Sequence, residues 1–328
     1  MIRLLALLAL LAAPLQAQEA PPFRIATGGT AGTYFPIGVL IAGAISAPPG
    51  SRPCAEGGAC GVPGLVATAI STRGAVANVE SILDGTFESG FVQSDVATWA
   101  ASGTGIWAGR APASDLVAIA NLYPESIHVV ARAELRLDAM SDLAGRRVSL
   151  GAEGSGTLVE ARFVLRAAGV DEASLDARYL AAEESAAALA EGALDAFFFA
   201  GGYPAQVVSD LAAATAVALV PIDGFEARAL LARHEFFVPD TIPAGTYAGQ
   251  DADVPTLGVS AQWVTHRDQP EDLIRAVTAA LWNETTRHLL DDGHAKGALI
   301  RLETALDGVG IDLHPGAERF YAEAGLLD

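Results

Sequence analysis

The hydrophobic pattern of the chain alternates between short apolar runs and longer runs with helical spacing, most of them separated by glycine or proline. Strand-like apolar runs occur at residues 23–26, 65–70, 87–95, 116–123, 127–130, 193–200, 216–221 and 257–264. Segments with helical spacing follow most of these runs. Strands that alternate with helices predict an α/β sheet that is covered by helices on both faces.

The alternation is interrupted in two places. Pro124 splits one apolar run, and a new strand–helix series begins around Ile127. Residues 239–255 form a long segment rich in Pro, Gly, Asp and Thr, after which a helix is expected from Asp272 to about Leu290. We therefore expect two lobes joined by a hinge, with the chain crossing near Pro124 and Trp263. The predicted lobes are residues 23–124 with 264–328, and residues 125–263.

The first strand leads into a glycine-rich turn and then into a helix. Glycines at 28, 29 and 32 let the backbone approach a ligand closely, and Thr33 is a plausible N-cap. A helix start of this kind presents free N–H groups and a partial positive charge, which favour an anion. The alternative is a purely structural turn. A second turn of the same design, residues 154–157, opens a helix far downstream and favours the ligand interpretation.

The first 17 residues have the pattern of a secretory signal peptide. Arg3 precedes an apolar run of about ten residues, and small residues lead to Ala17, where cleavage is expected. A membrane span would need about 20 apolar residues, so an uncleaved anchor is the weaker interpretation. The mature chain is therefore expected in the periplasm. In that compartment Cys54 and Cys60, the only two cysteines, are expected to form a disulfide.

The chain is strongly acidic, with 39 acidic and 20 basic residues and a formal net charge of −19. This balance argues against nucleic acid as a partner, although backbone donors still allow a small anionic ligand to bind locally. The only lysine, Lys296, lies outside both glycine turns, so no P-loop is present. Two cysteines without clustered histidines are too few for a zinc site, and we expect no cofactor.

The sequence offers little support for catalysis. Ser155 lies between two glycines, but Glu153 occupies the position where a nucleophile elbow needs glycine. The six histidines show no metal-binding His-Glu-x-x-His pattern. We therefore expect no enzymatic activity.

Several motifs in a fixed order resemble one known family. They are residues 26–38, 74–78, 92–95, 121–124, 154–157, 200–204, 242–247 and 313–317. Together they resemble the substrate-binding proteins of tripartite ATP-independent periplasmic (TRAP) transporters, in the TAXI subfamily. The resemblance implies a two-lobed flytrap fold, type II-like, that binds a small carboxylate or an amino acid such as glutamate. It also implies delivery to the integral membrane subunit of a TRAP transporter, and we expect a monomer. A flytrap that senses its ligand and signals without transport is the alternative.

The motifs predict a ligand site between the lobes. The residues expected on one wall are Thr27, Gly29, Thr30, Thr33, Tyr34, Asn78, Gln93 and Asp95, and those on the other are Ser155, Gly156, Thr157 and Tyr203. Each has a structural alternative: Asn78, Ser155, Thr157 and the 93–95 turn can cap helices, and the tyrosines can belong to the rim of the core. Arg73 is either a carboxylate clamp or part of a surface ion pair. We expect His314 to stabilise a turn.

Overall fold

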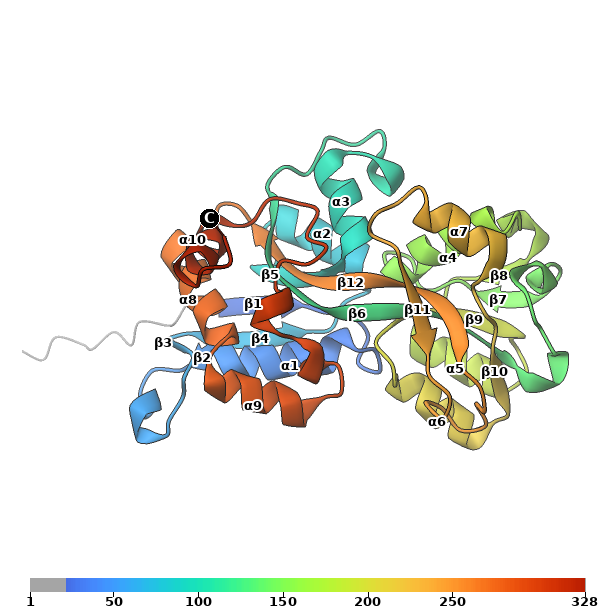
Figure 1. Cartoon of the computed structure of the whole chain (residues 1–328), viewed down its shortest axis with the longest axis horizontal. Coiled ribbons are helices and arrows are strands. Elements are labelled where there is room, and N and C mark those ends of the chain that lie inside the picture. The colour runs from blue at the N-terminus through green and yellow to red at the C-terminus, as the bar shows by residue number, and fades with distance from the viewer. Residues whose placement is uncertain (1–21, 328) are drawn as a thin grey trace, which may run out of the picture.

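The computed structural model describes residues 22–327, and its centre is one mixed β-sheet (Figure 1). Eight strands follow the order β4-β1-β5-β12-β6-β9-β7-β8, with β10 paired to β6 and β11 paired to β12. The strands are β1 Pro22–Ala26, β4 Val66–Ile70, β5 Ser89–Gln93, β6 Leu116–Arg132, β7 Arg147–Ser149, β8 Asp176–Arg178, β9 Ala196–Gly201, β10 Val217–Leu219, β11 Val238–Ile242 and β12 Val254–His266. Strands β2 (Ser46–Ala47) and β3 (Val62–Pro63) form a separate small sheet.

The sheet has two ends, each covered by its own helices, and we call them the N-terminal lobe and the second lobe. Parallel strands β1, β4 and β5 build the N-terminal lobe, and parallel strands β7, β8 and β9 build the second lobe. The helices of the N-terminal lobe are α1 Tyr34–Ile45, α2 Ala75–Leu83, α3 Ser94–Ser102, α8 Glu271–Leu281, α9 Glu284–Gly293 and α10 Pro315–Glu323. Those of the second lobe are α4 Gly156–Ala167, α5 Ala182–Ala190, α6 Gln206–Ala214 and α7 Gly224–Leu231. The expected α/β class is confirmed.

Two long antiparallel strands, β6 and β12, run through both lobes and connect them (Figure 1). The predicted break at Pro124 is wrong, because β6 continues through it. Pro124 pairs with Ser260 of β12, next to a register shift between Ala261 and Gln262. Pro124 itself is exposed to solvent. A bulge of this kind accommodates a residue that lacks an N–H. The lobe boundaries expected from the sequence stay a prediction.

Two further expectations about elements need correction. Part of the 239–255 segment is strand β11, whose antiparallel pairing with β12 the proline-rich sequence hides. The single helix expected from Asp272 to Leu290 is two helices, α8 and α9. The break occurs at Asn283, whose Oδ1 accepts the N–H of Thr286 at 2.9 Å and so caps α9.

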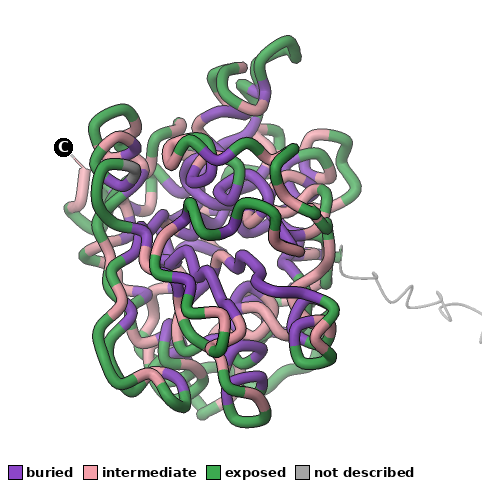
Figure 2. Tube along the Cα trace, turned by 90° about the vertical axis from the view of Figure 1, so that its right-hand side faces the viewer, coloured by how far each residue is buried: buried purple, intermediate pink, exposed green. Residues whose placement is uncertain are grey.

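The buried residues follow the sheet and the inner faces of its helices (Figure 2). The N-terminal lobe has a core around Phe91 and Trp263, and the second lobe has one around Val148 and Phe198. A further cluster joins α3 to α4 across the lobes and includes Trp99. The lobes are therefore in direct apolar contact beside the connecting strands.

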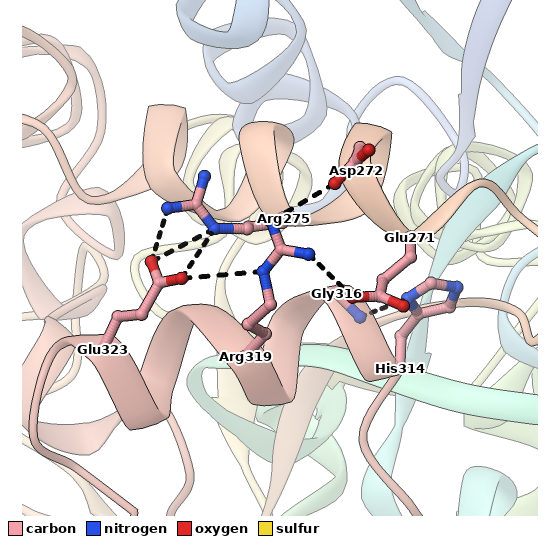
Figure 3. Close-up of polar contacts among 7 residues, drawn as sticks. All are labelled: Glu271, Asp272, Arg275, His314, Gly316, Arg319 and Glu323. Carbon is pink, nitrogen blue, oxygen red and sulfur yellow. Dashed lines mark hydrogen bonds and ion pairs between the residues drawn. The ribbon is translucent and has the colours of Figure 1, made fainter.

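The C-terminal helix α10 docks onto α8 through ion pairs (Figure 3). Arg319 pairs with Glu271 at 2.9 Å, and Arg275 pairs with Glu323. His314 begins the helix, because its Nδ1 accepts the N–H of Gly316 at 3.0 Å. The expectation that His314 stabilises a turn is confirmed.

Cys54 and Cys60 form the expected disulfide in the excursion between β2 and β3. Within residues 22–327, no helix combines the length and the apolar character that crossing a membrane requires. The predicted signal peptide, residues 1–17, lies outside the described residues.

Candidate functional site

A cavity of ≈ 180 Å³ lies between the lobes, and the N-termini of four helices line it. The N-terminal lobe contributes the starts of α1 and α2, and the second lobe contributes the starts of α4 and α5. Each helix start carries unpaired N–H groups and a partial positive charge of about half a unit. Their convergence makes the cavity attractive to an anion in a chain whose net charge is −19.

The N-termini of helices α2 and α4 are in direct contact across the cleft. The N–H of Ala77 in α2 donates to the carbonyl of Gly154 at 3.1 Å. Gly74 adopts φ 116°, and a Cβ built on it would lie 3.3 Å from Cα of Ser155. Glycine is therefore needed at position 74 both for its backbone conformation and for the close approach of the lobes.

The start of α4 presents its donors to the cavity. Ser155 caps the helix by accepting the N–H of Leu158 at 3.2 Å, whereas the N–H groups of Gly156 and Thr157 make no hydrogen bond with other described residues. Gln93 lies directly over Gly156, since a Cβ built there would be 1.8 Å from Gln93 Oε1. That oxygen is buried and has no partner among the described residues. It is therefore an acceptor available to a ligand.

The glycine turn before α1 is already in contact with a carboxylate of the protein. Glu183, at the start of α5, accepts the N–H of Ala31 at 2.9 Å. Its carboxylate also lies 3.2 Å from the position of a Cβ built on Gly29. The second lobe thus supplies an anion to the turn, and the free donors that remain for a ligand lie nearer α2 and α4.

Arg73 lies at the cavity mouth beside the start of α4. Its side chain is exposed, and its Nε is 3.6 Å from the position of a Cβ built on Gly154. Within residues 22–327 it forms no ion pair. Arg73 therefore presents an unpaired guanidinium where two helix N-termini meet.

The back wall of the cavity contains a buried carboxyl group, Glu125. Its Oε2 accepts the hydroxyl of Tyr34 at 3.1 Å, and the amide of Gln93 lies beside it. Burial raises the pKa of Glu125 to about 8, and the hydrogen bonds from Tyr34 and Gln93 oppose this rise only in part. At neutral pH this group is mostly an uncharged carboxylic acid, which does not repel an anion.

Seven of the twelve residues predicted for the ligand site line this cavity. They are Gly29, Thr33, Tyr34, Gln93, Ser155, Gly156 and Thr157. Two of these residues, Thr33 and Thr157, also accept hydrogen bonds from the backbone of other segments. Thr33 Oγ1 accepts the N–H of Gly202 at 2.9 Å across the lobes, and Thr157 Oγ1 accepts the N–H of Ala200 at 3.1 Å.

The other five predicted residues do not line the cavity. Thr27 is buried and donates to the carbonyl of Ile70 at 2.7 Å, whereas Thr30 is exposed. Asn78 is fully buried inside α2, where it neither lines the cavity nor caps the helix. Asp95 is buried in the first turn of α3. Tyr203 lies under Lys296, whose Nζ is 3.9 Å from the ring centre.

Gly28 and Gly32, which the sequence analysis expected to let the backbone approach a ligand, also line the cavity. The sequence analysis did not select for the site the remaining lining residues, which are Thr72, Gly74, Ala75, Glu125, Gly151, Ala152, Leu180, Ala181, Ala182, Glu183, Phe198, Phe199 and Ala200. The alanine-rich start of α5 carries no glycine signal. The turn before α2 does contain a glycine, Gly74. A glycine directly before a helical run predicts a turn with positive φ, and Gly74 has a φ of 116°. Residues 22–327 contain no group of His, Cys, Asp and Glu placed to hold a metal ion.

Solved structures with the same fold come from several bacteria. A protein of Bordetella bronchiseptica RB50 has a TM-score of 0.53 and 16% identity over 94% of this chain and 83% of its own. MatC of Rhodopseudomonas palustris, solved with bound malate, has a TM-score of 0.51 and 16% identity over 83% and 88%. PhnD1 of Prochlorococcus marinus, in complex with methylphosphonate, has a TM-score of 0.50 and 13% identity over 93% and 99%. At these identities the similarity establishes the fold, which is that of two-lobed binding proteins.

The sequence itself matches a family model over nearly its whole length. The match covers residues 25–325, from the first strand to beyond the end of α10. The chain belongs to the NMT1-like family.

Proposed function

We propose that this protein is an extracytoplasmic solute receptor that captures a small carboxylate or amino acid in the cavity between its lobes. The observation that carries the proposal is the convergence on one cavity of four helix N-termini and of Arg73, which has no ion-pair partner within the part of the chain that the structure describes. Backbone N–H groups and a guanidinium are the donors that bind carboxylates most directly. The cavity has no metal-binding group and no nucleophile–base pair among the described residues, so binding without chemistry is the simplest use of these donors.

The size of the cavity supports a small ligand. Its volume of ≈ 180 Å³ is close to that of an engineered cavity of about 150 Å³ that accommodates benzene. Glutamate-like amino acids and C4 or C5 dicarboxylates are of this order of size. MatC and PhnD1, which share the fold, are solved with malate and methylphosphonate, and both ligands are anions.

The TAXI resemblance supports a more specific role, in which the receptor delivers its ligand to the integral membrane subunit of a TRAP transporter in the periplasm. Residues 23–124 with 264–328 then move against residues 125–263 about β6 and β12. Contacts across the cleft, such as Ala77 to Gly154 and Thr33 to Gly202, favour the closed form. A ligand that touches both lobes shifts the equilibrium further toward it.

Calorimetric titration with L-glutamate, 2-oxoglutarate and malate tests the proposal. Arg73→Met is expected to weaken binding of the preferred ligand about tenfold or more, because a hydrogen bond to a charged group contributes about 1.5 kcal/mol or more. Arg228→Met is the matched control, since Arg228 is exposed on α7 and does not line the cavity. Absence of binding with all three compounds, or equal affinities for the two variants, would contradict the proposal. Ligand-dependent uptake into vesicles containing a TRAP membrane subunit tests delivery.

A further inference from the structure

Three buried carboxyl groups lie together behind the ligand cavity. Asp95 comes from α3, Glu125 from β6 and Glu160 from α4, and their exposed fractions are 0%, 2% and 0%. Both oxygens of Asp95 and both of Glu160 lack a hydrogen-bond partner among the described residues. Glu125 is the member of this acidic trio that lines the cavity.

The packing of α3 against α4 keeps water from Asp95 and Glu160. Their chain neighbours Val96 and Val159 belong to the same apolar cluster, which joins the two lobes. In this cluster the rings of Trp99 and Phe163 stack with their centres 4.4 Å apart. The two carboxyl groups therefore lie where the lobes meet.

Few charged groups face the trio to balance it. Glu125 receives the hydroxyl of Tyr34 from α1 and lies beside Gln93 of β5 and Tyr123 of its own strand. Lys296, from the segment after α9, is the one cation of the described residues that acts on Glu125. Its Nζ rests on the ring of Tyr203 at 3.9 Å and is also attracted by Asp240.

Ionising all three carboxyl groups would place three negative charges in an apolar interface beside a single lysine. Burying an unpaired carboxylate is so costly that such groups retain a proton instead. In agreement, burial raises the pKa of Asp95 to about 7 and that of Glu160 well above its ordinary value. Mutual repulsion with Asp95 and Glu125 adds to the rise for Glu160.

We propose that the cleft binds its anionic ligand together with protons, which the carboxyl groups of Asp95, Glu125 and Glu160 take up as the ligand's negative charge arrives. This inference rests on the proposed function, because it needs an anion in the cavity that Glu125 lines. Asp95 and Glu125, whose pKa values are raised to about 7 and about 8, are the members that are partly ionised near neutral pH. A carboxylate of the ligand disfavours negative charge on Glu125 most strongly, because Glu125 lines the cavity, and it also disfavours negative charge on Asp95 and Glu160 behind it. Each proton that one group takes up relieves the repulsion on the other two, so the three groups take up protons as one coupled set.

The direction of the pH effect follows from linkage. Below about pH 5 the trio is already protonated, so binding exchanges no protons and affinity is independent of these groups. Near pH 7.5 and above, binding consumes protons, so affinity falls as pH rises, by up to about tenfold per pH unit for each proton taken up. An anion site without this linkage would show no fall in affinity between pH 5 and pH 7.5.

The test uses the tightest binder among glutamate, 2-oxoglutarate and malate, whose carboxyl groups are all ionised near pH 7.5. Titration in two buffers with different ionisation enthalpies counts the protons. We expect uptake of a substantial fraction of a proton near pH 7.5 and almost none near pH 5. Asp95→Asn, which removes one carboxyl without touching the cavity, should reduce the uptake while binding persists near pH 6. Glu191→Gln, an exposed carboxyl at the end of α5, should behave as the unmodified protein.

Each outcome separates the two proposals. Absence of binding by all three compounds at every pH overturns the proposed function, and the inference that rests on it. Binding with the same heat in both buffers near pH 7.5 overturns the proton linkage and leaves the receptor function intact. Unchanged uptake in both Asp95→Asn and Glu160→Gln overturns the assignment to the trio. If one of these variants fails to fold, the other provides the comparison.

Discussion

Asn78 is expected to stabilise the fold without contacting the ligand, and replacing it with alanine separates these two roles. Its Nδ2 donates to the carbonyls of Thr27 and Phe91, both at 2.7 Å, and its Oδ1 accepts the hydroxyl of Thr72 at 2.6 Å. The side chain thereby joins α2 to the ends of β1 and β5. It is fully buried and does not line the cavity.

The size of the effect follows from the partners that Asn78→Ala would leave behind. Four polar groups lose a hydrogen bond: the carbonyls of Ala26, Thr27 and Phe91 and the hydroxyl of Thr72. The carbonyl of Thr27 can keep the hydroxyl of Thr72 as a donor at 2.8 Å, whereas those of Ala26 and Phe91 lose Asn78 in a buried setting. Leaving a buried polar group unsatisfied costs about 1–3 kcal/mol, so a loss of about 3–5 kcal/mol in the free energy of unfolding is expected. Affinity for the ligand should change less than about twofold wherever the variant is folded, because no donor of the cavity is removed.

Urea unfolding followed by tryptophan fluorescence, combined with calorimetric titration below the transition, measures both quantities. Glu80→Ala is the control on the same helix. Glu80 pairs with Arg110 at the surface, where such pairs contribute about 0–1 kcal/mol. A stable Asn78→Ala variant with tenfold weaker binding would refute the reasoning, because it would put the amide in the ligand site.

Three further predictions concern pH, packing and the disulfide. In the folded state Glu125 keeps its proton up to about pH 8, whereas in the unfolded chain it loses the proton near pH 4.5. The free energy of unfolding therefore falls as pH rises between these two values. Between pH 4.5 and pH 7 the unmodified protein should lose about 3 kcal/mol of stability through this group, and Glu125→Gln should not show this loss. Urea unfolding of both proteins at both pH values measures the difference. Gly156→Ala should weaken binding in calorimetry, since its Cβ would lie 1.8 Å from Gln93 Oε1 and would push that amide out of its place in the cavity wall. Gly43→Ala in α1, where nothing lies within 4 Å and φ is not positive, controls for the loss of a glycine. Mass spectrometry should find no alkylatable thiol at Cys54 or Cys60 until reductant is added, and Cys54→Ser with Cys60→Ser should cost about 2 kcal/mol.

The sequence predicted the parts of the site that follow local rules. Gly29 and Gly156 lie in turns at helix starts, where glycine, a capping hydroxyl and a following apolar run point to one geometry. Ser155 acts as the cap that its position before α4 indicates. These signals depend on a few neighbouring residues and are readable without the rest of the fold.

The missing parts depend on tertiary contacts that no local pattern encodes. Glu125 follows Pro124 in a stretch that looks like a polar break, and only the pairing of β6 with β12 puts it inside the sheet. The start of α5 has neither glycine nor a hydroxyl cap, and it reaches the cavity because Glu183 crosses to the turn at Ala31. Asn78 looked like a cap or a ligand residue because both are common uses of an amide. Burial alone distinguishes the structural use.

The opposition between a net charge of −19 and a cavity built for an anion is resolved by where the charges lie. Surface carboxylates are screened beyond about 8 Å in physiological salt, whereas helix N-termini act over a few ångströms inside the cleft. Of the two acids that line the cavity, Glu183 accepts the N–H of Ala31, and Glu125 is held largely in the neutral form by burial. Burial also favours the neutral form of Asp95 and Glu160 behind the cavity. Burial therefore reduces the negative charge of Asp95, Glu125 and Glu160, which would otherwise oppose the binding of an anion in the cavity. The same burial makes that advantage depend on protons, because the cavity becomes less attractive to an anion as soon as one of these carboxyl groups ionises.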